Sequence, residues 1–156
     1  MVDRRRLLAA GWVWGLPTVP AFAQLLSQSL PVSRHLSQEL SAANRAGQPL
    51  VVMVSLAGCS FCHTARRSHL LPLQRAGMPI VQVDMRSDAA LNDFQNHVTT
   101  HDGMVRRWKV TKAPTLLFFG PGGQELAERM EGAYLPDFYG AYLEDRLSPA
   151  RVTLKR

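Results

Sequence analysis

The stretch LVVMVSLAGCSFCH, residues Leu50–His63, decides the fold of this chain. Its first half, Leu50–Leu56, is an apolar run rich in valine, which is typical of a buried strand. Gly58 follows as a hinge, and the polar and basic residues after it predict a helix that begins at Cys59. A cysteine at a helix N-terminus meets free amide donors and the positive end of the helix dipole, which lower its pKa from about 8.5 to roughly 3.5–7.5. The stretch therefore predicts a reactive thiolate at the carboxyl end of a strand.

The second cysteine of the stretch, Cys62, lies one helical turn after Cys59 and can close a disulfide with it. The chain has 2 cysteines, so none is left to join distant segments, and the pair indicates redox chemistry rather than a structural framework. In thiol–disulfide exchange, Cys59 attacks a substrate disulfide, and Cys62 then attacks the mixed disulfide and releases the reduced substrate. We expect Cys59 to be the exposed sulfur and Cys62 the shielded one.

The N-terminus has the three zones of a secretory signal peptide. Arg4–Arg6 form a basic opening, Leu7–Leu16 an apolar stretch, and Ala21–Ala23 a small-residue cleavage site. We therefore expect export to the periplasm, an oxidising compartment. The alternative is an uncleaved membrane anchor, although the apolar stretch is short for a bilayer and two prolines interrupt it. The expected organisation is a signal peptide (1–23), one domain (24–150) and a basic tail (151–156).

The charge pattern argues against nucleic-acid binding. The chain has 18 Lys and Arg against 12 Asp and Glu, a net charge of +6. These basic residues are scattered on solvated faces in small clusters, such as Arg66–Arg67 and the tail 151–156, whereas a nucleic-acid surface needs a concentrated stripe with aromatics between the charges. We expect a monomer with no cofactor and no bound metal.

The remaining periodicity predicts alternating helices and strands. A helix over Val32–Gly47 has Ser33 as a possible N-cap. The helix that opens at Cys59 runs to Arg75, with a kink or break near Leu70–Leu71 because Pro72 removes a backbone donor. Pro79–Met85 is a strand parallel to the first. The next segments are predicted as a helix (Asp88–His97), a break (Thr99–Gly103) and a short helix (Met104–Trp108). A hairpin of two strands follows (Pro114–Phe119 and Gln124–Met130). The last predicted element is a helix (Leu135–Leu147) that buries Phe138, Tyr142 and Leu143 and stops at Pro149.

This order of elements resembles the thioredoxin fold. Two motifs carry the resemblance: the Cys59–Cys62 pair after a strand, and the segment Trp108–Phe119, which is followed by a glycine-rich turn and Gly132. The resemblance covers Val32–Leu147. It implies an α/β fold, a thioredoxin-like three-layer sandwich with a central mixed β-sheet flanked by helices, and the activity of an exported, periplasmic thiol–disulfide oxidoreductase.

The resemblance also assigns roles around the cysteines. In thioredoxin-like proteins the second motif holds a cis-proline beside the disulfide, which maps onto Pro114. That proline exposes the backbone of Ala113 for pairing with an extended substrate, and an X-Pro bond is the only cheap place for a cis peptide. Phe61 joins these two as a substrate-binding residue. Ser60 and His63 are expected to tune the dithiol.

Three departures from the family bear on the direction of electron flow. Thioredoxin has a tryptophan before its first cysteine and a buried aspartate six residues before it, where this chain has Gly58 and Met53. Strong periplasmic oxidants have a histidine between the cysteines, where Phe61 cannot donate a hydrogen bond. A less stabilised thiolate makes a weaker oxidant, which favours a reductase. By resemblance, its partners are a client protein with a disulfide or thiol and a membrane thiol-electron transporter as donor.

Several alternatives stay open from the sequence. The first is an oxidase or isomerase of the same fold, and the second is a redox-inactive binding module. The third is a c-type haem protein, since His63 completes a Cys-x-x-Cys-His signature. A zinc site would need both cysteines and two histidines, and candidate ligands are His63, His69, His97 and His101. Asp84 closes its strand either as a solvated acid or as a residue facing the active-site end of the sheet.

Overall fold

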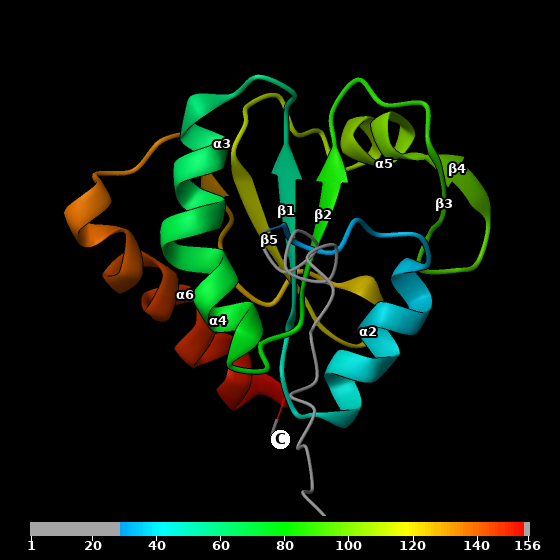
Figure 1. The fold of residues 1–156 in the computed structure, drawn as a ribbon. Helices are drawn as coiled ribbons and strands as arrows, with labels where there is room; N and C mark the ends of the chain where they lie inside the picture. The colour runs from blue at the N-terminus through cyan, green and yellow to red at the C-terminus, as the bar shows by residue number, and fades with distance from the viewer. Residues whose placement is uncertain (1–28, 155–156) are drawn as a thin grey trace, which may run out of the picture.

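The computed structural model describes residues 29–154, and the predicted signal peptide lies outside this range. A four-stranded sheet forms the centre, in the order β2-β1-β5-β6 (Figure 1). The first two strands are parallel, whereas β5 is antiparallel to both β1 and β6. The mixed sheet is therefore as predicted. The strands are β1 (Leu50–Ser55), β2 (Ile80–Asp84), β5 (Thr115–Phe119) and β6 (Met130–Glu131).

Helices cover both faces of the sheet, which gives the predicted three-layer α/β sandwich. Successive residues of a strand point to opposite faces, and accordingly Val51 and Met53 pack in one buried cluster while Val52 and Val54 pack in the other. The first cluster lies under α3, η1, α4 and α6, and the second lies under α2 and α5 (Figure 1). The helices are α2 (Leu36–Arg45), α3 (Ser60–Thr64), the π-helix η1 (Ala65–Leu70), α4 (Leu71–Arg75), α5 (His101–Arg107) and α6 (Tyr139–Leu154).

Pro72 changes the type of helix rather than breaking it. Proline lacks an N–H, and its ring clashes with the carbonyl four residues earlier in an α-helix. The chain is π-helical over Ala65–Leu70, and the N–H of Leu71 donates to the carbonyl of Arg66. Such a wider turn is a common way to absorb an irregularity inside a helix. The helix therefore stays continuous from the disulfide to Arg75.

The predicted helix over Asp88–His97 is wrong. This segment contains the strand β3 (Ala90–Asn92), which pairs with β4 (Val98–Thr100) directly after the segment to form a small separate sheet. The carboxylate of Asp93 accepts hydrogen bonds from the backbone N–H groups of Gln95 and His97, both at 2.9 Å. An aspartate that bonds its own following backbone favours a turn over a helix.

A helix begins where the sequence predicts a break. The Thr100 side chain caps α5 by accepting from the N–H of Gly103 at 3.0 Å, an arrangement that stabilises helix starts. At the other helix start, the residue before α2 is His35 and makes no side-chain cap. Ser33, the predicted cap, is buried and donates to Glu39 at 2.6 Å instead.

The last helix also differs from its prediction. A 3-10 turn over Pro136–Phe138 precedes α6, and Phe138 is exposed rather than inward. Pro149 lies inside α6 and does not stop it. Its ring is on the exposed side, while Leu147 and Ala150 are buried. Burial of that opposite face offsets the lost backbone hydrogen bond.

The second strand of the hairpin differs from its prediction. The strand is shorter than the predicted Gln124–Met130, because Glu125 makes only an isolated bridge to Phe119 before β6 begins.

Within residues 29–154, no helix has the length and apolar character needed to cross a bilayer.

Candidate active site

Cys59 and Cys62 form a disulfide at the start of α3, with their Cα atoms 5.2 Å apart. Cys59 is the N-cap residue, and its sulfur accepts from the N–H of Cys62 at 3.1 Å. The two sulfurs differ in access, since Cys62 is 1% exposed whereas Cys59 is only partly buried. An incoming thiol or disulfide therefore reaches Cys59 first.

The turn between β1 and α3 places this disulfide at the carboxyl end of the central strand. Gly58 has φ of +75°, a conformation that costs other residues free energy. The N–H of Cys59 donates to the carbonyl of Leu56 at 3.2 Å and closes the turn. Because β1 is fully buried, the turn that positions Cys59 follows a strand fixed in the core.

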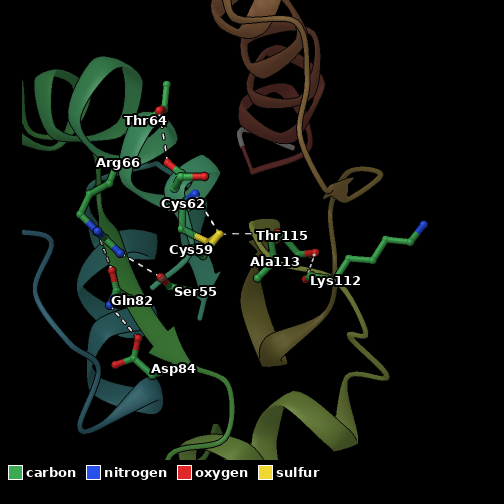
Figure 2. The surroundings of a disulfide bond; sticks show 11 residues. Ser55, Cys59, Cys62, Thr64, Arg66, Gln82, Asp84, Lys112, Ala113 and Thr115 are labelled. Carbon is green, nitrogen blue, oxygen red and sulfur yellow. Dashed lines mark hydrogen bonds between the residues drawn. A yellow bond between two sulfur atoms is a disulfide. The ribbon is translucent and has the colours of Figure 1, made fainter. Parts of the chain in front are cut away.

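The loop before β5 lies against the exposed sulfur. The Ala113–Pro114 peptide bond is cis, and the sulfur of Cys59 is 3.8 Å from the carbonyl oxygen of Ala113 (Figure 2). Because a disulfide sulfur carries no hydrogen, this distance is a contact rather than a hydrogen bond. The Pro114 carbonyl accepts from Gly132 N–H at 2.7 Å, which ties the loop to the chain leading out of β6. The structure thus brings Ala113 and Pro114 next to the disulfide.

An apolar pocket lies on the Pro114 side of the disulfide. Its walls include Phe61, which is 62% exposed, and a stack of His69 on Tyr139 with ring centroids 4.4 Å apart. Burial lowers the pKa of His69, so its imidazole stays uncharged at neutral pH. This pocket suits an apolar side chain. The remaining lining residues are Thr64, Ala65, Ala133 and Tyr134.

A polar pocket lies on the other side of Cys59, at the carboxyl ends of β1 and β2. The guanidinium of Arg66 donates to Gln82 Oε1 at 2.9 Å and to Ser55 Oγ at 2.8 Å. The amide of Gln82 in turn donates to Asp84 Oδ1 at 2.7 Å. Figure 2 shows this chain of side chains beside the two cysteines. Asp84 therefore lies at the active-site end of the sheet, the second of its two sequence interpretations.

The environment of the inner sulfur is apolar. Met53 is fully buried and packs with Cys62 in the same cluster. Ser60 and His63, predicted to tune the dithiol, are both exposed. Among residues 29–154, neither of their side chains makes a hydrogen bond to a sulfur, and the backbone N–H of His63 donates to the carbonyl of Cys59 at 3.1 Å.

The histidines considered as zinc ligands do not join the cysteines or acids in a metal site within the described residues. His101 is buried, accepts from the N–H of Asp84 at 3.0 Å through Nδ1, and has Nε2 3.1 Å from the Ser33 carbonyl. Both ring nitrogens of His101 thus contact backbone groups. In the part of the chain that the structure describes, no three His, Cys, Asp or Glu residues gather as a metal site. A haem attached through Cys-x-x-Cys-His would require both sulfurs, which are here bonded to each other.

Sequence reasoning missed the role of Arg66, which it treated as part of a small basic cluster on the surface. One signal was available. Gln82 stands between Val81 and Val83 in a strand whose other inner positions are apolar, and a polar residue on a covered sheet face needs a partner. The adjacent helix supplies that partner as Arg66.

The fold agrees with the comparisons to known proteins. Residues 36–147 match the family of thioredoxin-like domains, and the chain belongs to that family. No curated protein matches it by sequence.

Solved structures of similar fold include one described as "DsbH Oxidoreductase", at 16% identity and a TM-score of 0.51, with 86% of this chain and 93% of that one covered. A thioredoxin from Thermus thermophilus shares 17% identity at a TM-score of 0.49, with 79% and 88% covered. A thioredoxin-fold protein from Helicobacter pylori shares 13% identity at a TM-score of 0.47, with 70% and 81% covered.

Proposed function

We propose that this protein is a periplasmic thiol–disulfide oxidoreductase that reduces disulfides in client proteins. One observation carries the proposal: a disulfide at the start of a helix with a single accessible sulfur, that of Cys59, in contact with the cis-proline loop at Ala113. A redox pair needs one sulfur that a substrate reaches and a second that the substrate does not. The family match adds a fold in which such pairs exchange electrons.

The proposed reaction starts from the reduced protein. The Cys59 thiolate attacks one sulfur of the client disulfide, that bond breaks, and the other client sulfur leaves as a thiolate. Cys62 then gives its proton to water and attacks the Cys59 sulfur, which releases the second client thiol. Two electrons have passed to the client, and the protein is left with the Cys59–Cys62 disulfide.

The side chains around the disulfide support this direction. A disulfide becomes a strong oxidant when its reduced thiolate is strongly stabilised. Phe61 stands between the cysteines and has no donor for the thiolate, and Met53 provides no charge beneath Cys62. The N–H of Cys62 is the donor that the structure provides to the Cys59 sulfur. The reduced form therefore gains little stability from its thiolate, and the dithiol should donate its electrons to a client disulfide.

The apolar pocket and the Ala113 backbone suit an extended polypeptide as substrate. Phe61 and Pro114 both line the pocket, so a client chain paired along Ala113 would place an apolar side chain there. Regeneration requires a donor of two electrons, and a membrane thiol transporter would deliver them to an exported protein. Export itself rests on the predicted signal peptide over residues 1–23, which a fractionation experiment with and without these residues tests directly.

The activity is tested by insulin reduction with dithiothreitol. The wild type should accelerate it, Cys59→Ser should abolish the acceleration, and Cys62→Ser should accumulate a mixed disulfide with the client because its second step is removed. The reduction potential should lie near about −270 mV, as in thioredoxin, rather than near about −120 mV, as in a strong periplasmic oxidant. Disulfide exchange at the normal rate by Cys59→Ser would overturn the proposal.

A further inference from the structure

The polar pocket beside Cys59 contains an arginine, Arg66, whose charge is not paired with an acid among the described residues. Arg66 is partly buried, and its two hydrogen-bond acceptors, Ser55 Oγ and Gln82 Oε1, are neutral. Among residues 29–154, no carboxylate lies within ion-pair distance of it. These two hydrogen bonds thus hold the guanidinium without a counter-ion from the described residues.

The acid of this network, Asp84, is linked to Arg66 only through Gln82. Asp84 Oδ1 accepts from the amide of Gln82, which stands between the carboxylate and the guanidinium. The pocket lining also includes Arg86 and His63, both exposed at its edge, and Asp84 is the acidic residue of the lining. Removing a cation from water without a paired anion is unfavourable. A pocket of this kind is prepared for a ligand that brings the negative charge.

Cys59 lines the same pocket. A group bound there therefore lies next to the sulfur that forms the mixed disulfide. The contact of Cys59 with Ala113 lies on the opposite side of the sulfur from Arg66 (Figure 2). A substrate seated along Ala113 and joined to Cys59 would thus extend a neighbouring residue toward Arg66.

We propose that this pocket is a carboxylate subsite for the thiol or disulfide substrate, with Arg66 as its anchor. The inference rests on the proposed function and adds a substrate class to it: client segments that have Asp or Glu close to the reacting cysteine. Arg66 donates to Gln82 through Nε and to Ser55 through Nη2, so among the described residues its Nη1 is left to donate a charge-assisted hydrogen bond to a carboxylate. Arg66 acts here as a specificity-determining residue.

Two disulfide-linked peptides test the subsite. They are identical except for Glu or Gln next to the cysteine, and kcat/KM is measured for each at low salt. The wild type should favour the Glu peptide by about tenfold, the size expected for one charge-assisted hydrogen bond. Arg66→Gln should remove the preference, mainly through KM, and Arg66→Lys should retain part of it. The matched control is Arg67→Gln, which removes an exposed charge outside the pocket lining and should keep the full preference.

The outcomes separate the inference from the proposed function. Equal rates for the two peptides with wild type, or a preference that survives in Arg66→Gln, would overturn the inference alone. A wild type that reduces neither peptide would overturn the proposed function, and the inference with it. Oxidised glutathione is a third substrate, and its Arg66-dependent reduction together with equal rates for the two peptides would overturn the assignment to acidic client segments in favour of a small disulfide. Urea unfolding of each variant shows that the compared proteins are folded.

Discussion

Oxidation should stabilise this protein, and the size of the effect follows from the short loop that the disulfide closes. Cys59 and Cys62 are separated by 3 positions. Closing a loop of about four residues lowers the entropy of the unfolded chain by an amount worth about 2 kcal/mol at 25 °C. In the folded protein, the Cys59 sulfur accepts from the N–H of Cys62. Because the surroundings of Cys62 are apolar, reduction brings no large compensating gain. We therefore expect the oxidised form to be more stable by about 2 kcal/mol.

This stability difference also reports the direction of electron transfer. Unfolding and reduction form a thermodynamic cycle, so a disulfide that stabilises the fold is harder to reduce in the folded protein than in the unfolded chain. At about 1.4 kcal/mol per 30 mV, 2 kcal/mol corresponds to a potential about 40 mV lower. An oxidant shows the reverse order, because its reduced form is the stabilised one.

Urea unfolding at pH 7, with and without a reducing phosphine, measures the difference. With a slope of about 2 kcal/mol per molar urea, the oxidised midpoint should lie about 1 M higher. A double variant with both Cys59→Ser and Cys62→Ser should show the same midpoint in both conditions. A reduced protein that is more stable than the oxidised one would refute the reasoning and indicate a disulfide donor.

Three further perturbations test other parts of the structure. Burial opposes the ionised form of Asp93, but the Arg107 guanidinium and two backbone N–H groups outweigh it and lower the pKa of this carboxyl. The stability that the ionised Asp93 gives the folded protein is therefore present above about pH 4 and lost as the pH falls through the lowered pKa. Asp93→Asn should lower the unfolding free energy at pH 7 and flatten its decline in acid, and an unchanged acid profile would contradict this. Burial lowers the pKa of His69 against Tyr139, so stability should fall as the pH drops below about 6.5 and through the folded value. His69→Gln should reduce that part of the pH dependence, and a steeper profile would count against it. Phe118 is fully buried, and Phe118→Ala should cost about 3–5 kcal/mol in urea unfolding, whereas a loss below 1 kcal/mol would show a loosely packed centre.

The parts of the fold that the sequence predicts well have strong local signals. Leu50–Ser55 is apolar at every position but the last and ends in a glycine turn, so its strand and the following helix need no tertiary information. The same holds for Thr115–Phe119 after Pro114. Both pairs of neighbours, β1 with β2 and β5 with β6, follow from the connections between them.

The wrong predictions concern segments whose structure depends on contacts made elsewhere. The Asp93 carboxylate turns the chain because it accepts hydrogen bonds from two backbone N–H groups that follow it and from Arg107 in the next helix. These bonds override the helical pattern of Asp88–His97. Pro149 is tolerated because its ring faces outward while Leu147 is buried. Local propensity is a weak guide wherever such packing decides.

The candidate site divides in the same way. The cysteines are visible in the sequence because their chemistry requires two thiols at a short fixed spacing, and the place of Pro114 beside them is implied by the resemblance to the thioredoxin fold. Arg66 is not visible in this way, since its role depends on Ser55 and Gln82, which are 11 and 16 positions from it and belong to different strands. A network of side chains across two strands and a helix appears only when the three are packed together.

Met53 and Arg66 are expected to act on different steps of the proposed reaction. Thioredoxin has a buried aspartate at the position of Met53, where a carboxylate lies close to the resolving cysteine, whereas this chain places its charge at Arg66, in the pocket of the attacking cysteine. A cation on that side acts on binding and on the first attack, and the release step proceeds in apolar surroundings. Salt screens exposed charges over about 10 Å at 0.1 M. Formation of the mixed disulfide with an acidic client should therefore slow with ionic strength, while its resolution by Cys62 should not.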